Sequence, residues 1–392
     1  MNAPATTTIH GDNDPRFDGL REAFAATFTA PTELGAALAV TVDGKPVVDL
    51  WAGVIDGART QPWQRDTLVT VFSTTKGLTA ICAHRLVDQG LLDLDAPVAK
   101  YWPEFAAAGK ERVLVRSLLD HRAGLAAIRE PLPPEAMFDW ERMTGALAAQ
   151  EPWWVPDQDH GYHAVTFGWL IGEVIRRASG KTVGAYLRDE IAGPLGLDLH
   201  IGLDEAHDAR CAHVRPGPRP PAGEETLFDR ILKDPEGMSA KAFMNPMSML
   251  VPGMLSSRAW RGGEAPSVNG HVTARALARL YGALACGGAV DGVRVLSPES
   301  VARCHGERSS GMDRTLGVTT RFSLGFMLSQ PHESFGPNDA SFGHPGAGGS
   351  LGFADPVARV GFGYVMNRMG TSILLDPRAK GLIAALYTCL GA

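Results

Sequence analysis

Ser73 and Lys76 have the residue types and the spacing of a nucleophile and its base. They belong to the run T-L-V-T-V-F-S-T-T-K-G (residues 67–77), in which a β-like segment is followed at once by a predicted helix. Residues three apart share a helix face, so the hydroxyl and the amine can converge. The positive helix start and burial would lower the lysine pKa from its free value of about 10.4, so that a neutral amine can accept the serine proton. A serine helix cap beside a solvated lysine would show the same spacing, so the rest of the chain must decide.

Two later stretches could complete a site for acyl transfer, which also needs a proton shuttle and an oxyanion hole. Tyr162 lies on a predicted loop between helices, and a tyrosine there can carry protons if nearby cations lower its pKa. The run H-P-G-A-G-G-S (residues 344–350) is rich in glycine, which lets a backbone N–H approach a ligand closely. Together with the N–H of Ser73, such a group would form an oxyanion hole.

Other patterns predict less chemistry. Ser350 lies in G-G-S-L-G (residues 348–352), which matches the G-x-S-x-G nucleophile elbow, but β-like runs flank it and no histidine follows it. The same run lacks the third glycine of a dinucleotide-binding fingerprint. His160 and His163 are three residues apart without an evident third ligand, so we expect no metal site.

The composition is that of a folded globular chain of 392 residues, with 45% hydrophobic and 20% charged residues. The net charge of −6 and the lack of a basic run argue against nucleic acid as a partner. No apolar stretch is long enough to span a membrane, and the first residues lack a basic and then apolar leader, so the default prediction is a cytoplasmic protein. The five scattered cysteines, none in a CxxC pair, suit reduced thiols.

The order of predicted elements indicates an α/β (α+β) fold. A β-hairpin around Asp43-Gly44 comes early, β-like runs come late, and helices occupy most of the middle. We therefore expect an antiparallel sheet built from both ends of the chain and flanked by terminal helices, formed by residues 1–80 and 270–392. Residues 81–269 would be an inserted all-helical domain. Residues 1–15 are expected to be a loose arm, and residues 204–268 long loops with one short helix near 227–232.

Several predicted elements have defined limits. They are helices over residues 17–28, 73–88, 113–119, 167–178, 183–191 (ended by Gly193-Pro194), 273–286 and 379–390, and β-like runs over residues 36–52, 322–328, 349–354 and 360–366.

The motifs resemble those of the serine β-lactamase/penicillin-binding-protein superfamily, whose motif set is S-x-x-K, S-D-N and K-T-G. S-T-T-K (73–76) matches the first motif. G-Y-H-A (161–164) stands where the class C branch has Y-x-N, and H-P-G (344–346) where others have K-T-G. The flanking runs L-L-D-H-R-A-G-L (118–125) and G-H-P-G-A-G-G-S-L-G-F-A-D-P (343–356) also resemble that branch. Over roughly residues 15–390, the chain most resembles the class C β-lactamase-like esterases called family VIII carboxylesterases, and this resemblance implies a two-lobed β-lactamase/transpeptidase-like fold.

The resemblance also implies roles for individual residues. Ser73 would be the acylated nucleophile, Lys76 the base that activates it, and Tyr162 the group that protonates the leaving alkoxide and then assists water. The backbone N–H groups of Ser73 and Ala347 would form the oxyanion hole. His344 would contact substrate, although a purely structural histidine is an equal alternative.

Three further substrate contacts are predicted beside these: Gly346 on the glycine-rich run, and Trp153 and Trp154 just before the tyrosine, which could line an acyl pocket or simply anchor their loop.

Two departures from the family pattern bear on the substrate. His344 replaces a lysine that binds the carboxylate of a lactam, and Ala164 replaces an asparagine that holds the acylamino side chain of a lactam. A neutral imidazole binds a carboxylate less well than a lysine does, and a methyl group holds an acylamino side chain less well than an asparagine does. Both changes favour a neutral carboxylic ester.

We therefore expect a serine hydrolase of small carboxylic esters with short acyl or aryl groups, a carboxylesterase that uses no metal and no cofactor and whose partner is a small-molecule ester. The alternatives are a β-lactamase or D-alanyl-D-alanine peptidase, an acyltransferase, and a catalytically inactive binding protein of the same fold. The oligomeric state is left open.

Overall fold

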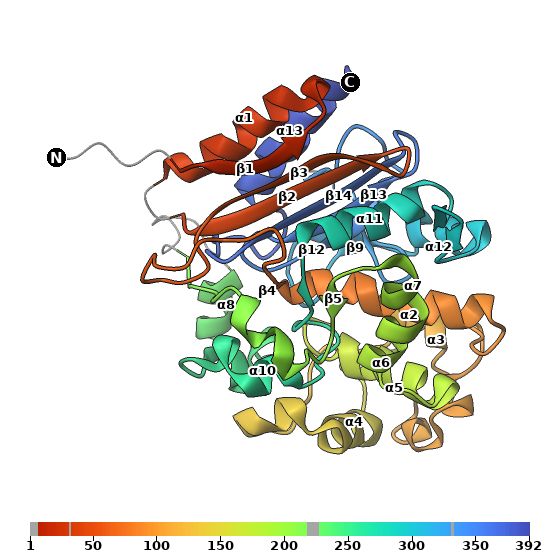
Figure 1. Cartoon of the computed structure of the whole chain (residues 1–392). Coiled ribbons are helices and arrows are strands. Elements are labelled where there is room, and N and C mark those ends of the chain that lie inside the picture. The colour runs from red at the N-terminus through yellow and green to blue at the C-terminus, as the bar shows by residue number, and fades with distance from the viewer. Residues whose placement is uncertain (1–6, 31–32, 218–226, 331–332) are drawn as a thin grey trace.

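A nine-stranded antiparallel sheet is the centre of the computed structural model, which describes residues 7–30, 33–217, 227–330 and 333–392 (Figure 1). Strands from both ends of the chain meet where β14 pairs with β2, from Val360↔Val42 to Met366↔Ala36. The strands, in order across the sheet, are β1 (Ile9–Asn13), β3 (Lys45–Gly53), β2 (Gly35–Val42), β14 (Val360–Met366), β13 (Leu351–Asp355), β12 (Phe342–Pro345), β11 (Met327–Leu328), β10 (Thr319–Phe322) and β9 (Ser309–Met312).

Helices cover both faces of this sheet. The terminal helices α1 (Asp18–Ala26) and α13 (Pro377–Leu390) pack together on one face, and α11 (Ala274–Ala285) lies on the other (Figure 1). The approach of α11 is close because β14 carries glycine there. A Cβ on Gly361 would lie 2.2 Å from the backbone nitrogen of Gly282. The predicted sheet with flanking terminal helices is confirmed.

Most of the remaining helices lie beneath α11, and α12 lies beside it (Figure 1). Their bounds, with the short strands among them, are β4 (Val69–Thr70), α2 (Thr75–Asp88), α3 (Val115–Leu119), α4 (Trp140–Ala149), α5 (Phe167–Ser179), α6 (Val183–Leu187), α7 (Gly193–Leu195), β5 (Leu199–His200), α8 (Leu227–Lys233), α9 (Met238–Met244), α10 (Arg258–Gly262), β6 (His271–Val272), β7 (Ala289–Val290), β8 (Val293–Arg294) and α12 (Pro298–His305). The division into residues 1–80 with 270–392 and 81–269 stays a prediction.

Two regions differ from the prediction of loose chain. Residues 9–13 form the edge strand β1, which pairs with β3 from Ile9↔Ala52 to Asn13↔Val48. Within residues 204–268, α9 and α10 accompany the predicted helix α8. These elements have five to seven residues, too few for a periodic pattern to identify, and they form because tertiary neighbours supply pairing and burial.

Two predicted limits were also wrong. The run 322–328 is not one strand, because a turn at Gly325 (φ +93°) separates β10 from β11. Gly193-Pro194 does not end the helical run that begins at Val183. A π-helical turn, Arg188–Ala192, carries that run into α7, so that Pro194 lies within the continued helix.

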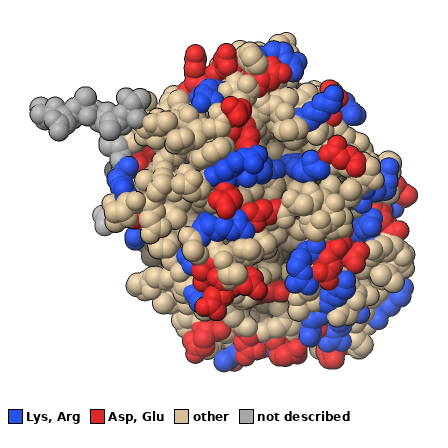
Figure 2. Space-filling view, viewed as in Figure 1, with Lys and Arg blue, Asp and Glu red and all other residues tan. Residues whose placement is uncertain are grey.

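The surface mixes both signs of charge. On the face shown in Figure 2, basic side chains lie among acidic ones. Pairs such as Arg65–Asp49 and Arg279–Asp291 join them at N···O distances of 3.0 and 2.9 Å. Exposed pairs of this kind stabilise a fold only weakly. In the described part of the chain, no helix combines the length and the apolar character needed to cross a membrane.

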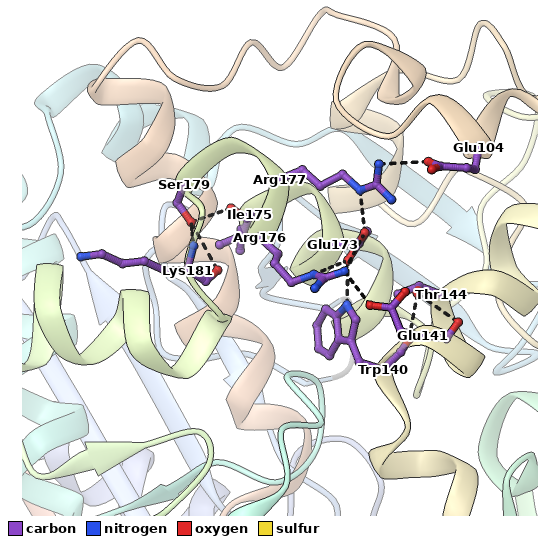
Figure 3. Close-up of polar contacts among 10 residues, drawn as sticks. All are labelled: Glu104, Trp140, Glu141, Thr144, Glu173, Ile175, Arg176, Arg177, Ser179 and Lys181. Carbon is purple, nitrogen blue, oxygen red and sulfur yellow. Dashed lines mark hydrogen bonds and ion pairs between the residues drawn. The ribbon is translucent and has the colours of Figure 1, made fainter.

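Helix α5, which follows directly on the Tyr162 segment, is held by the buried carboxylate of Glu173 (Figure 3). This side chain is 1% exposed and accepts hydrogen bonds from Trp140 Nε1 at 2.7 Å and from two arginines of its own helix. The nitrogen atoms Arg176 Nε and Arg177 Nε lie 2.9 and 2.6 Å from its oxygens. Burial raises the pKa of Glu173, but these donors outweigh burial and hold the pKa below its ordinary value.

We predict that Glu173→Ala lowers the free energy of unfolding by about 1–3 kcal/mol, because it leaves the Trp140 indole N–H without its acceptor and takes from Arg176 and Arg177 one of the two carboxylates that each contacts. Since the pKa of Glu173 is lowered by folding, the contribution is complete above the pKa of an unfolded glutamate and is lost as pH falls through the folded pKa. Urea denaturation at neutral and acid pH measures both effects. The control is Glu141→Ala, whose carboxylate is 78% exposed and should contribute about 0.5 kcal/mol or less. Equal losses in the two variants would contradict the assignment.

Candidate active site

Ser73 and Lys76 lie where the chain passes from β4 into α2. Ser73 lies in a 3-10 helix of one turn, Phe72–Thr74, and Lys76 is the second residue of α2. Phe72 takes a positive φ of 45°, which is uncommon for a residue with a side chain and marks local strain at the turn. Ser73 is partly exposed while its neighbours are buried. The turn therefore presents this one hydroxyl to a ligand.

The amine of Lys76 is fully buried and points at this hydroxyl. Its Nζ lies 3.3 Å from Ser73 Oγ, 2.6 Å from the carbonyl oxygen of Ala164 and 3.2 Å from that of Ser267. Burial holds the pKa of Lys76 well below its ordinary value. Within the described residues, no carboxylate forms an ion pair with it. A neutral amine has two N–H groups, which the two carbonyls accept, and one lone pair, which remains for the Ser73 hydroxyl.

Side-chain hydrogen bonds hold the two carbonyls in place. Ser267 Oγ donates to the carbonyl of Val165 at 2.6 Å, and Thr79 Oγ1 donates to the carbonyl of Pro266 at 2.5 Å. The segments 164–165 and 266–267 are thereby fastened to each other and to α2. Sequence reasoning missed Ser267, since its backbone carbonyl, which any residue provides, contacts the amine.

Tyr162 lies across the lysine from the turn. Its ring centroid is 4.8 Å from Lys76 Nζ, and its side chain hydrogen-bonds Ser73. Burial raises the pKa of the phenol, and the hydrogen bond to Ser73 only partly opposes that rise. The expectation that nearby cations lower this pKa is therefore wrong. Tyr162 rests as a protonated phenol, a state suited to donating a proton.

The histidines around this centre are neutral. His344 is 1% exposed, burial lowers its pKa to about 3, and its ring centroid lies 5.9 Å from that of Tyr162. Its Nδ1 lies 2.7 Å from the carbonyl of Pro345, while Nε2 has no partner within the described chain. His163 uses both ring nitrogens on backbone groups, 2.7 Å from the Gly161 carbonyl and 3.1 Å from the Leu125 N–H. A contact of His344 with substrate stays a prediction.

The turn between β12 and β13 lies against the turn that carries Ser73. Ser350 Oγ donates to the carbonyl of Val71 at 2.8 Å and lies 3.2 Å from Thr74 Oγ1. Gly346 is required here, because a Cβ would lie 2.2 Å from the Val71 carbonyl oxygen. Ala347 is the partly exposed residue of this buried turn. Its N–H, like that of Ser73, has no acceptor among the described residues. The hydroxyl of Ser350 serves to attach the turn.

The predicted tryptophans are tied to their own loop. Trp153 Nε1 donates to the carbonyl of Ala127 at 2.8 Å, and Trp154 Nε1 donates to that of Asp159 at 3.1 Å. The phenylalanine rings beside Tyr162 are those of Phe322 and Phe243, with centroids 6.0 and 6.5 Å away, and the His121 ring is closer at 5.2 Å. Sequence reasoning missed both, because Phe322 ends a short strand and Phe243 lies on α9, which was not predicted.

The chain is similar to known proteins along almost its whole length. The family model described as Beta-lactamase matches residues 24–385. Esterase/beta-lactamase LipL of Mycobacterium tuberculosis is 38% identical over 390 residues, which cover 95% of this chain and 86% of that protein. A crystal structure of a family VIII carboxylesterase superposes with a TM-score of 0.87 at 41% identity, covering 97% of this chain and 100% of that one. The crystal structure of a penicillin-binding protein homologue from Caulobacter crescentus superposes with a TM-score of 0.89 at 42% identity, covering 97% of this chain and 100% of that one.

We predict that Gly346→Ala slows the reaction of Ser73 with a fluorophosphonate probe by about 10-fold or more, because the new methyl group must push the turn away from Val71 and misplace the Ala347 N–H. Labelling rates followed by mass spectrometry measure the effect. The control is Gly381→Ala on α13, where a Cβ meets nothing within 4 Å and where alanine favours the helix by about 1 kcal/mol. Unchanged labelling of the Gly346 variant would show that the turn does not serve the nucleophile.

Proposed function

The chain belongs to the beta-lactamase family and is a carboxylesterase, and we propose that it hydrolyses small neutral esters through an acyl-enzyme formed on Ser73. One observation carries the proposal. The buried amine of Lys76 lies within hydrogen-bond distance of two carbonyls and of one partly exposed hydroxyl, that of Ser73. In its neutral form it would donate to the carbonyls and accept the hydroxyl proton at its lone pair. The buried Lys110 directs its amine at three carbonyls, those of Ala107, Ala148 and Gln150, whereas Lys76 directs one of its three contacts at a hydroxyl.

In the proposed reaction, Ser73 Oγ–H passes its proton to Lys76 Nζ as Oγ bonds to the ester carbonyl carbon. The negative charge that develops on the carbonyl oxygen is stabilised by the N–H groups of Ser73 and Ala347. As the bond to the alcohol oxygen breaks, Tyr162 donates its phenolic proton to the leaving alkoxide and takes one back from Lys76. Water then attacks the acyl group by the reverse proton path, which releases the acid and restores Ser73.

The surroundings of the amine suit its transient charge. Once protonated, Nζ would face the carbonyls of Ala164 and Ser267 and the aromatic faces of Tyr162 and Phe167, whose ring centroids lie 4.8 and 5.9 Å away. Carbonyl oxygens and ring faces both attract a cation, but they lack the full negative charge of a carboxylate, which would keep the amine protonated at rest. This environment allows the amine to be neutral at rest and charged in the transition state.

The charge of the site supports a neutral substrate. Burial keeps His344 uncharged where a lysine would bind a carboxylate, and Ala164 offers only a methyl group as its side chain. A carboxylate placed here would lose water and gain no cation in return. The relative named Esterase/beta-lactamase makes lactam hydrolysis the second candidate, and we propose that it is the weaker activity.

We predict that Ser73→Ala reduces hydrolysis of p-nitrophenyl acetate to the background rate while leaving the fold intact, because it removes the hydroxyl that lies beside Lys76 Nζ. Ser350→Ala is the matched control, since it also removes one hydroxyl but should mainly lower stability, by about 1–2 kcal/mol. Parallel assays with nitrocefin compare ester and lactam turnover. Ester turnover that survives Ser73→Ala would refute the mechanism. Faster turnover of nitrocefin than of the ester would show that lactam hydrolysis is the stronger activity.

The lowered pKa of Lys76 predicts a specific pH dependence. The base works only when neutral, so kcat/KM should rise as pH rises through the pKa of Lys76, with its midpoint well below the value of about 10.4 for a free lysine. Lys76→Arg should be inactive at every accessible pH, because a guanidinium with a pKa above about 12 keeps its proton. Initial rates across pH measure both outcomes. A Lys76→Arg enzyme with substantial activity would exclude the amine as the base.

A further inference from the structure

Asp313, which sequence reasoning did not single out, lies between β9 and β10 at the edge of the large sheet. Its side chain is fully buried. Oδ1 accepts the N–H groups of Thr315 and Leu316, both at 2.8 Å, and Oδ2 accepts Thr320 Oγ1–H at 3.1 Å. These bonds shape the β9–β10 turn. Both oxygens also accept the backbone N–H of Tyr162, each at 3.0 Å.

The hairpin that carries Asp313 holds Tyr162 in two further ways. The ring of Phe322 stacks on the Tyr162 ring, with centroids 6.0 Å apart and planes 6° from parallel. The N–H of Arg314 donates to the carbonyl of His160 at 3.1 Å. The packing leaves no room for a side chain at position 161, where a Cβ would lie 2.9 Å from Thr315 Oγ1. The backbone, the ring and the preceding residues of Tyr162 are thus fixed by one hairpin.

A carboxylate is the side chain that satisfies this arrangement. Four groups donate to Asp313: the N–H groups of Tyr162, Thr315 and Leu316 and the hydroxyl of Thr320. An amide in its place would keep one acceptor oxygen and turn an NH₂ group toward the others, so that donor faces donor at the Tyr162 N–H. Relief of that contact requires the Tyr162 backbone to move.

We propose that Asp313 is the positioning residue of Tyr162, and that its carboxylate sets the backbone of the tyrosine so that the phenol reaches Ser73 and Lys76. This inference rests on the proposed function, because it requires Tyr162 to take part in the reaction. Asp313 reaches neither substrate nor the reacting atoms and acts through Tyr162. Displacement of a catalytic group by about 1 Å can lower a rate by about 100-fold.

The chain contains a matched control in Asp355. This aspartate is equally buried and builds the same local turn, with Oδ1 accepting the N–H groups of Val357 and Ala358 at 2.9 and 3.0 Å. Oδ2 accepts Asn338 Nδ2–H and Tyr387 Oη–H at 2.7 and 2.5 Å. It differs from Asp313 in bonding α13 instead of the Tyr162 segment. The pair separates loss of a buried turn from loss of the contact to Tyr162.

The test measures kcat, KM and Tm for p-nitrophenyl acetate hydrolysis by the wild type, Asp313→Asn and Asp355→Asn. We expect both variants to lose thermal stability. Asp313→Asn alone should lower kcat, by about 10- to 100-fold, with KM within a few-fold of the wild type. Equal kcat values in the two variants would overturn the proposal. If Asp313→Asn does not fold, Thr320→Val, which removes one donor and leaves the carboxylate, carries the test with a smaller fall in kcat.

A double-mutant cycle with Tyr162→Phe distinguishes positioning of the phenol from a purely structural role, because it compares the effect of Asp313→Asn on kcat with and without the phenol. If Asp313 acts through the phenol, Asp313→Asn should change kcat by less than about twofold in the Tyr162→Phe background. A full, additive loss in that background would overturn the proposal. A wild type that neither hydrolyses the ester nor reacts with a fluorophosphonate would overturn the proposed function and this inference together, whereas an active wild type with additive losses overturns this inference alone.

Discussion

The burial of the Lys76 amine without a carboxylate partner is the constraint on which the rest of the site depends. An ammonium in such a place would be costly, and burial holds the pKa of Lys76 well below its ordinary value, as the proposed role of base requires. The amine lies within hydrogen-bond distance of the carbonyls of Ala164 and Ser267 and of the Ser73 hydroxyl. A salt bridge would have raised the pKa and kept the amine protonated. The low pKa of Lys76 thus follows from its burial, with no ion-pair partner among the described residues.

Convergence of distant segments maintains that constraint. The turn of Ser73, the loop of Tyr162, the carbonyl of Ser267 and the β12–β13 turn are far apart in the sequence. Hydrogen bonds between buried groups attach these segments to one another, such as Ser350 Oγ to the carbonyl of Val71 and Ser267 Oγ to that of Val165. Buried polar groups of this kind are costly when left unpaired, so the segments have few alternative arrangements. The site is precise because its supports are buried.

The same burial that lowers the pKa of Lys76 keeps the surrounding histidines uncharged. His163 and His344 both have a pKa near 3, and the first cause in each case is loss of water. A positive charge beside Lys76 would lower its pKa further but would also draw anions to the site. Neutral imidazoles and aromatic rings leave the site weakly charged. This electrostatic character connects the architecture to the proposed preference for neutral esters.

The sequence alone was sufficient to select Ser73, Lys76 and Tyr162 as candidates, and to predict the hairpin at Asp43-Gly44 and the helix that ends at Asp88. Those features follow from local rules: turn residues, helical periodicity and short motifs. Only the tertiary structure revealed the edge strand β1, the helix α9 with Phe243, the Ser267 carbonyl, and the carboxylate of Asp313 on the Tyr162 N–H. It also showed the burial that lowers the pKa of Lys76 and raises that of Tyr162. These features depend on which groups lie together away from water, and that is a property of long-range packing.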